Sequence, residues 1–534
     1  MNPQLDNEVA PSTREVAHLL YTSAVELARR IAAGELRAVE VVEAHIHRIE
    51  QVNPAINAIC WPRFDEARRE AETVDLRRAR GEALEPLAGV PITVKECFHL
   101  PGTPSSIGIG RLADEPLSDE SINVARLRAA GAIVVGKTNV PQLMIMHETD
   151  NPVYGCTDNP WDTSRGPGGS SGGEGAIIAA GGVPLGLGND LGGSVRHPAH
   201  VCGICGLKPT TGRLSNQGAR GTWNGMEAVG NQPGPLAQCV ADVALAMRVL
   251  ADPGQHGHDP YVPDVRWRDP DQVDVASLRI GYFTDDGFFP PSPALRRAVR
   301  EAASALEQQG ATVVELPPPD MRRAMRLYFA LVSADGGADA RRLLGRSKRD
   351  WRVRKLLWLG MIPKWLRPAV AQGLDWTWQP RMGELIRSAG YASADRYWQL
   401  TKQRERFTVD FCAQLRAKNI DALLCPPHAL PALTHGSTQY LAAAASYAML
   451  FNLVGMPAGV VPVTRVQAGE EGDRPASWDA IDYAARKVEA DSAGLPVGVQ
   501  IAAHHWREDV VLRLMQALED RLRGGEDYSL RPPL

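Results

Sequence analysis

The sequence predicts an α/β fold: one large, mixed, twisted β-sheet covered by helices on both faces. Short apolar runs rich in β-branched residues, typical of buried strands, alternate with amphipathic helical segments through most of the 534 residues. Predicted strands lie on both sides of a glycine-rich core at 165–213, and no change in composition marks a linker. These observations favour one domain over two.

Local signals place the elements. Ser23 and Glu26 have the spacing of a capping box, and Asn53-Pro54 is expected to end the second helix. In chain order we expect a helix opened by that box, helices at Val39–Val52 and Phe64–Arg80, a strand at Leu87–Val94 that ends at Lys95, a helix at Ser121–Ala130, a strand at Ala132–Val135, a helix at 171–182 and a strand at Val183–Gly188. The second half adds strands at Leu278–Phe283, Ala311–Leu316, Asp421–Cys425, Gly459–Val463 and Leu495–Ala502, and helices at Pro293–Gln309 and Glu508–Leu522.

Composition excludes several function classes. A formal charge of −4 with mixed signs gives little support to a nucleic-acid partner. The eight cysteines are scattered, and Met1–Asp6 lacks the pattern of a signal peptide, so we expect a cytoplasmic protein. No run approaches the roughly 18 apolar residues of a spanning helix, so we expect a soluble or peripheral protein.

Two serines, Ser170 and Ser194, each lie in a glycine-rich stretch. Glycines let successive backbone N–H groups point into one concavity, which holds an anion. If that anion is the oxygen formed when a serine attacks a carbonyl, the backbone of Leu191, Gly192, Gly193 and Ser194 is an oxyanion hole beside its own nucleophile. On the glycines alone, a simple turn or a phosphate cradle stays open.

Three other motifs could indicate a different functional site. Residues 131–138 match the nucleotide P-loop letters, but a strand occupies the positions that should be loop, so we reject that interpretation. Residues 168–172 match a Gly-x-Ser-x-Gly elbow, with His428 or His504 as later bases, but a loop at 159–167 replaces the strand it needs. Cys202-Gly203-Ile204-Cys205 is a single CxxC motif with no second cysteine pair at metal-binding spacing, which favours packed thiols over a metal site.

Serine combined with lysine fits better. A serine hydroxyl needs a base, and lysine serves only when burial lowers its pKa. Lys95 would close a buried strand, although a lysine there is more often a solvated edge residue. Glu96 would point to the opposite face. Two serines and Lys95 could therefore form a proton wire without histidine.

The motifs resemble one family closely. The amidase signature family is matched by three stretches, Gly168–Gly173, Gly188–Arg196 and Cys202–Thr210. The spacing also agrees with the family, with 75 residues from Lys95 to Ser170 and 24 from Ser170 to Ser194. The fatty acid amide hydrolase branch of that family is resembled most at Thr138–Gln142, Pro457–Thr464 and Gly494–Gln500. The resemblance implies an amidase-signature fold with one domain over 1–534 and its core at 80–260.

The resemblance also implies roles. Ser194 would be the nucleophile, Ser170 the relay through a cis Gly169–Ser170 peptide, and Lys95 the base, with an acyl-enzyme and no cofactor or metal. Asp190 and Arg196 would brace the oxyanion loop, and a homodimer is implied. The substrate-lining candidates are Met144, Ile145 and His147. The departures from the family pattern are Asn189 for threonine, His197 for an aromatic residue and Gln238-Cys239 for a basic-small pair.

The segment 351–378 has the composition of an interfacial helix. Its tryptophans are Trp351, Trp358, Trp365, Trp376 and Trp378, and its basic residues are Arg352, Arg354, Lys355, Lys364 and Arg367. We expect a membrane or substrate cap that lies on a bilayer or lids an apolar channel, suited to fatty-acid or aryl amides. An ordinary surface helix that packs its aromatic rings inward is the alternative.

Two other functions stay open. One is the A-type subunit of an amidotransferase, which would supply ammonia from glutamine for aminoacyl-tRNA transamidation. The other is a catalytically silent membrane-binding or protein-binding module.

Overall fold

A computed structural model describes residues 19–223, 225–251, 254–363, 365–377, 379–525, 528 and 531–534. The sequence predictions at Met1–Asp6, Lys364 and Trp378 lie outside these residues. Within them, no helix is both long and apolar enough to cross a bilayer.

An α/β architecture is confirmed, with one mixed sheet of 11 strands in the order β1-β3-β2-β6-β8-β7-β12-β13-β11-β9-β10. Strands β2, β3 and β6 run parallel, as do β9, β10 and β11, whereas the middle strands pair antiparallel. The strands are β1 (Ile59–Pro62), β2 (Pro91–Lys95), β3 (Ile133–Thr138), β6 (Leu185–Asp190), β7 (Cys205–Lys208), β8 (Gln232–Ala237), β9 (Arg279–Tyr282), β10 (Thr312–Glu315), β11 (Ala422–Cys425), β12 (Ala458–Arg465) and β13 (Pro496–Ala503), and the two-stranded hairpin is β4 (Asp150–Asn151) with β5 (Gly155–Cys156).

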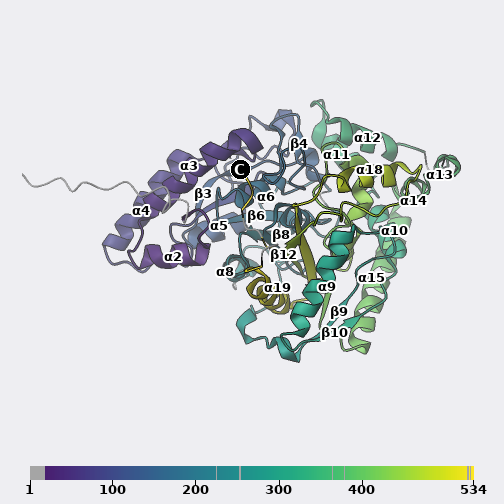
Figure 1. Ribbon diagram of the computed structural model, residues 1–534. Helices are drawn as coiled ribbons and strands as arrows, with labels where there is room; N and C mark the ends of the chain where they lie inside the picture. The colour runs from purple at the N-terminus through teal and green to yellow at the C-terminus, as the bar shows by residue number, and fades with distance from the viewer. Residues whose placement is uncertain are drawn as a thin grey trace, which may run out of the picture.

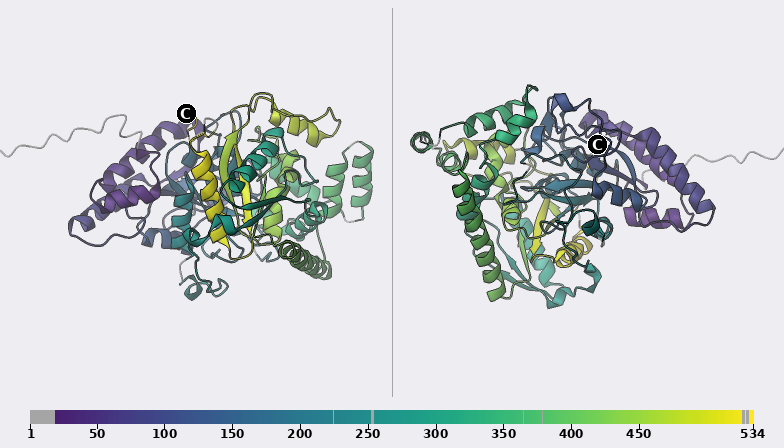
Figure 2. Two further views of the ribbon diagram at one scale, coloured as in Figure 1. Left: turned by 60° about the horizontal axis from the view of Figure 1, so that its bottom comes forward. Right: turned by 180° about the vertical axis from the view of Figure 1, so that it is seen from behind.

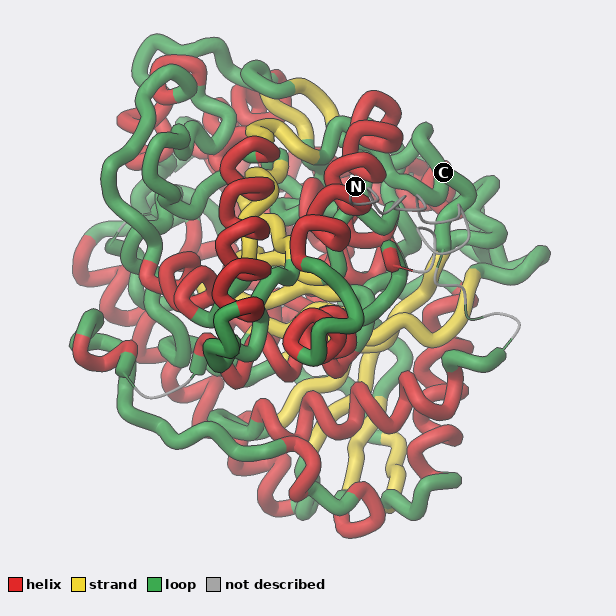
Figure 3. The backbone as a smooth tube through the Cα atoms, turned by 90° about the vertical axis from the view of Figure 1, so that its left-hand side faces the viewer, coloured by secondary structure: helices red, strands yellow, loops and turns green. Residues whose placement is uncertain are grey.

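Helices cover both faces of the sheet. Successive residues of β2, β6 and β13 are all buried, which requires packed layers on either side. Figure 3 shows the strands running through the molecule with helices around them. The helices are α2 (Ala24–Ala32), α3 (Ala38–Ile56), α4 (Phe64–Ala79), α5 (Ile122–Ala129), α6 (Gly172–Ala179), α7 (Arg196–Cys202), α8 (Val240–Leu250), α9 (Pro293–Glu307), α10 (Met321–Val332), α11 (Ala338–Leu344), α12 (Trp351–Gly360), α13 (Arg367–Trp376), α14 (Pro380–Ser388), α15 (Ala394–Ala417), α16 (Thr438–Leu441), α17 (Ser446–Leu453), α18 (Ala480–Glu489) and α19 (Glu508–Leu522).

The peripheral helices form two groups on opposite sides of the sheet region. Helices α2, α3 and α4 lie on one side in Figure 1, and α11 to α14 lie at the other end. Figure 2 shows the same separation from two further directions. The glycine-rich core therefore lies between an N-terminal helical layer and the helices that contain the tryptophan-rich segment.

Several predicted boundaries were wrong in detail. Strand β6 runs to Asp190, two residues beyond the expected end, because its pairing with β8 continues to that residue. Helix α6 ends at Ala179, and α3 continues past Pro54 to Ile56, where Asn57 closes it in the left-handed conformation. Proline removes only one N–H donor, so the last turn accommodates it.

Candidate active site

Lys95 lies at the carboxyl end of β2, fully buried. Strands β2 and β6 are parallel neighbours, so their carboxyl ends meet at the same edge of the sheet. There the Lys95 Nζ donates to Ser170 Oγ at 2.8 Å and to Asn189 Oδ1 at 2.7 Å. The sheet thus brings Lys95 beside Asn189, 94 positions later, and Ser170 reaches the same amine from the loop before α6.

Burial is the main cause of the lowered pKa of the Lys95 amine. It lowers the pKa of Lys95 to about 8, against the opposing charges of Cys97, Asp190 and Glu174. Burial also raises the pKa of Glu174 to about 8, although Thr93 and Thr138 donate hydrogen bonds to that carboxyl. Glu174 is therefore largely protonated at neutral pH and adds little negative charge beside Lys95.

Asn189, which replaces the threonine of the family pattern, is a hydrogen-bond partner of Lys95. Its Nδ2 donates to Cys97 Sγ at 3.4 Å, which turns its carbonyl oxygen toward the lysine. An amide oxygen only accepts, and it carries no charge that would hold the ammonium form. Asn189 thus positions Lys95 and leaves its lowered pKa in place.

The two glycine-rich segments lie side by side. The Gly169–Ser170 peptide is cis, and the Ser171 N–H donates to the Ser194 carbonyl at 3.2 Å. Ser170 is 2% and Ser194 7% exposed, so both hydroxyls lie in a largely closed site. The hydrogen bonds of the described chain join Lys95 to Ser170, and none of them joins the Ser170 hydroxyl to the Ser194 hydroxyl.

A buried ion pair braces the loop at 191–194. Both Asp190 oxygens accept from the Arg196 guanidinium at 2.9 Å, and both residues are fully buried. Burial opposes the charged carboxylate, but the Arg196 charge and hydrogen bonds outweigh it and hold the pKa of Asp190 well below its usual range. The Gly193 N–H donates to Asp190 at 2.8 Å. In the described part of the chain, the N–H groups of Leu191, Gly192 and Ser194 have no acceptor, so they are the available donors.

Tyr328 and His147 fix the carbonyl side of this loop. The Tyr328 hydroxyl donates to the Leu191 carbonyl at 3.1 Å, and His147 Nε2 lies 3.1 Å from the Gly192 carbonyl. A carbonyl only accepts, so Nε2 carries the hydrogen. A Cβ at Gly192 would overlap the Tyr328 hydroxyl, which explains glycine there. Sequence reasoning missed Tyr328 because no local motif connects α10 with a loop 137 residues earlier.

The other two substrate candidates are placed by hydrophobic packing. Met144 and Ile145 are half-buried and pack against the larger hydrophobic core. His147 belongs to a stack of buried imidazoles, with ring centroids 4.9 Å from His197, which lies 4.4 Å from His428. Burial lowers the pKa of His147 to about 4, so the ring is neutral at physiological pH.

The structure agrees with rejection of the competing motifs. Strand β3 spans the P-loop letters, and the buried Lys137 Nζ donates to Thr103 and Ser105. Among the described residues, neither His428 nor His504 has a hydrogen bond to a serine: the Leu430 N–H donates to His428 Nδ1 at 3.1 Å, and His504 Nε2 lies 2.9 Å from the Ile420 carbonyl. All eight cysteines are free thiols, and Cys202 and Cys205 are buried.

The tryptophan-rich segment forms α12 and α13. Trp351, Trp358, Trp365 and Trp376 are all exposed, with Trp365 at 80% and Trp376 at 77%, so these rings do not pack inward. Apart from the exposed Arg354, the basic side chains that the structure describes behave differently. Arg352 is buried among Glu148, Asp150 and Asp350, Lys355 donates to Gln439, and Arg367 donates to the carbonyls of Ile362 and Ala389. The exposed face is therefore aromatic more than cationic.

A cavity of about 300 Å³ lies beside α10. Its lining residues are mostly apolar or aromatic: Trp223, Gly225, Met226, Leu331, Val332, Ala334, Asp335, Asp339, Ala392, Ala394 and Tyr397. Leu331 is one turn from Tyr328, and Leu191 and Met226 pack against the same hydrophobic cluster as Tyr328. The cavity therefore lies along the helix that contacts the loop at 191–194.

Comparison with known proteins places this fold among amidases. The amidase family model matches residues 40–512. Fatty-acid amide hydrolase 1 from Sus scrofa is 36% identical over 536 residues, covering 99% of this chain and 89% of the relative. The A-type subunit of a glutamyl-tRNA(Gln) amidotransferase from Chloroflexus aggregans is 34% identical, covering 97% and 99%. The solved structure of a fatty acid amide hydrolase superposes with a TM-score of 0.83 at 26% identity, covering 97% of this chain and 87% of that one.

Fold and comparisons together define an enzyme that hydrolyses carbon–nitrogen bonds in amides, which counts against a catalytically silent module. The chain belongs to the amidase signature family, with relatives in its fatty acid amide hydrolase branch.

The environment of Lys95 yields a pH-dependent prediction. Lysine acts as a base only above its pKa, so kcat/KM should fall as pH drops through about 8. Asn189→Asp would place a carboxylate at the 2.7 Å contact and favour the ammonium form. We expect the acid limb of the pH profile to move up by about 1–3 pH units. Asn216→Asp, at an exposed position, is the control; an active Asn189→Asp enzyme with an unmoved limb would contradict this role.

Proposed function

We propose that this protein is a serine hydrolase that cleaves linear amides through Lys95, Ser170 and Ser194. The observation that carries the proposal is the 2.8 Å contact between the fully buried Lys95 amine and the Ser170 hydroxyl. The Ser171–Ser194 backbone contact supports it, since it holds the second serine beside the first. A lysine that loses its charge as pH rises through about 8, one hydroxyl, and a second hydroxyl beside backbone donors are the parts that acyl transfer needs.

In the proposed reaction, the neutral Lys95 amine accepts the Ser170 proton while Ser170 accepts that of Ser194. The Ser194 oxygen attacks the substrate carbonyl, and the N–H groups of Leu191, Gly192 and Ser194 stabilise the oxyanion. Return of the proton to the nitrogen breaks the C–N bond and releases the amine. Water then attacks the acyl-enzyme and gives its proton to the same relay of Ser170 and Lys95. This step frees the carboxylic acid.

The cavity beside α10 supports substrates with a long acyl or aryl group. Its volume of about 300 Å³ and its apolar lining fit a hydrocarbon chain better than the polar side chain of glutamine. The similarity to the amidotransferase subunit keeps glutamine as the second candidate substrate. We favour fatty-acid or aryl amides because both the cavity and the exposed tryptophans are apolar.

Narrowing the cavity should change acyl preference. Val332→Trp adds bulk to the cavity wall, so kcat/KM for a dodecanoyl p-nitroanilide should fall at least about tenfold, while that for the acetyl analogue stays within about twofold. Val409→Trp, at an exposed position on α15, is the matched control. Equal losses for both substrates would contradict the acyl cavity, and glutaminase activity without anilide hydrolysis would favour the amidotransferase function.

The exposed face of α12 and α13 supports peripheral membrane contact. Four exposed tryptophans lie on this short segment, and aromatic rings of this kind settle at the lipid headgroup level. Arg352, Lys355 and Arg367 are engaged within the protein, so ring insertion would dominate over attraction to anionic lipid. A lid over the substrate path is the competing role of this segment.

Liposome flotation tests this role. The protein should float with phosphatidylcholine vesicles, and adding phosphatidylserine should change the bound fraction little because few cationic groups are free. Trp365→Ala combined with Trp376→Ala should reduce binding several-fold, whereas Tyr261→Ala, at another exposed ring, should not. Wild-type protein that stays unbound, or an unchanged double variant, would leave the lid as the function of this segment.

A cytoplasmic location and a homodimer remain our proposals. The eight free thiols are compatible with a reducing compartment.

A further inference from the structure

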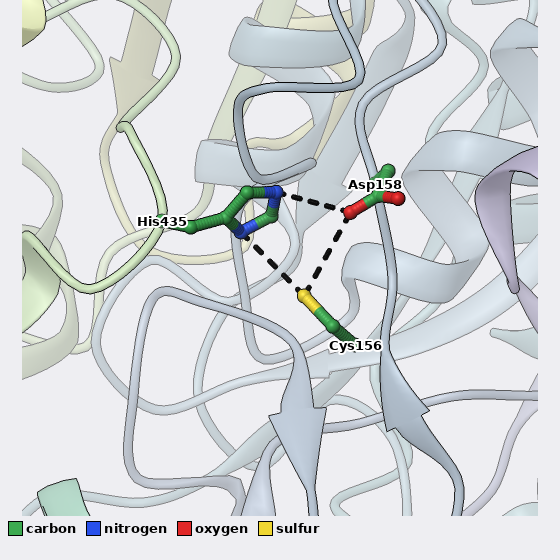
Figure 4. A group of neighbouring side chains, drawn as sticks. All are labelled: Cys156, Asp158 and His435. Carbon is green, nitrogen blue, oxygen red and sulfur yellow. Dashed lines mark hydrogen bonds and ion pairs between the residues drawn. The ribbon is translucent and has the colours of Figure 1, made fainter.

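Outside the catalytic centre, three side chains of metal-binding types converge. Cys156 ends β5, Asp158 follows two residues later, and His435 comes from the loop before α16 (Figure 4). Cys156 Sγ lies 3.5 Å from His435 Nδ1 and 3.8 Å from Asp158 Oδ1, and His435 Nε2 lies 3.0 Å from Asp158 Oδ1. All three ligand atoms are within 4.8 Å of one another.

These spacings suit a shared cation. With bonds of about 2.3 Å to sulfur and about 2.0 Å to nitrogen, a tetrahedral zinc ion holds the two atoms about 3.5 Å apart. The Cys156–His435 separation of 3.5 Å equals that value, and the Cys156–Asp158 separation of 3.8 Å needs only a modest opening of the angle. Asp158 contacts the other ring nitrogen, Nε2, at 3.0 Å, so coordination through Nδ1 requires the imidazole and the Asp158 carboxylate to reorient and give up that contact.

A fourth acidic group adjoins the three. Glu148 Oε1 lies 3.7 Å from His435 Nδ1, and its side chain is only 2% exposed. Its other oxygen, Oε2, is buried and has no hydrogen-bond partner among the described residues. Arg352 and the Gly436 N–H already contact Oε1, so the carboxylate is partly compensated, and Oε2 is the oxygen left for a further cation.

The backbone already holds the ligands in place. The Thr157 N–H donates to the Thr149 carbonyl at 2.8 Å, and the Asp158 N–H donates to the Ile56 carbonyl at 3.0 Å. On the other segment, the Gly436 N–H donates to Glu148 Oε1 at 2.6 Å. These bonds fix the backbone next to each ligand, which lowers the ordering entropy that opposes binding.

We propose that Cys156, Asp158 and His435 form a binding site for a zinc-like divalent transition metal, with Glu148 beside them. Thiolate, imidazole and carboxylate together are a ligand set for zinc and not for magnesium or calcium. Binding releases the thiol proton and frees one imidazole nitrogen of its proton, because only the deprotonated groups coordinate. The proposal is independent of the amide substrate.

Titration of the full-length protein with cobalt(II) and with zinc(II) tests the site. We expect one equivalent to bind, with a thiolate-to-cobalt charge-transfer band that zinc abolishes. Cys156→Ser should remove the band, and Cys156→Ser and His435→Gln should each weaken zinc binding at least about tenfold. Cys60→Ser is the matched control, because Cys60 is the other half-buried thiol.

Melting temperatures measured without metal would show that the variants fold. Three results would overturn the proposal: no saturable binding, a band that survives Cys156→Ser, or equal weakening by Cys60→Ser. In those cases the cluster is an ion pair between His435 and its acidic neighbours, without a metal.

Discussion

The active site depends on removing the charge of one lysine. Lys95 is buried at the end of a central parallel strand, where water cannot stabilise its ammonium form. Its two strong contacts are neutral groups, the Ser170 hydroxyl and the Asn189 amide oxygen. A carboxylate at either position would favour the ammonium form and move the proposed use of Lys95 as a base to higher pH. The raised pKa of Glu174 keeps the nearest acid of α6 from doing so.

The negative charge that the site does contain is paired elsewhere. Asp190 lies next to Asn189 on β6, yet Arg196 neutralises it through two hydrogen bonds. Breaking a buried pair of this kind costs roughly 3–5 kcal/mol, so the pair is a fixed element of the loop. Tyr328 and His147 then hold the carbonyls of Leu191 and Gly192 in the same loop, while the Gly193 N–H donates to Asp190. Arg196 thus compensates the charge of Asp190, and Tyr328 and His147 fix the carbonyls of the loop that follows it.

Local signals predicted much of the fold and part of the site. The serine-bearing segments are glycine-rich because close backbone approach requires it, and that requirement is visible in the chain itself. Strand β8 was not predicted, because Pro233 and Pro235 favour a turn in isolation, whereas pairing with β6 and β7 makes it a central strand. The role of Lys95 came from family resemblance. Tyr328 and the Glu174 hydrogen bonds arise from contacts between segments distant in the chain, which no spacing within one segment could predict.

The central claim is that Ser194 is the nucleophile and that Lys95 draws its proton. Fluorophosphonate labelling followed by peptide mass spectrometry tests it most directly. The account predicts an adduct on Ser194 whose rate of formation rises with pH through about 8, following the lowered pKa of Lys95, and nearly vanishes in a folded Lys95→Ala variant. An active protein with Ser194 unmodified, or a Lys95→Ala variant labelled at the wild-type rate, would contradict it.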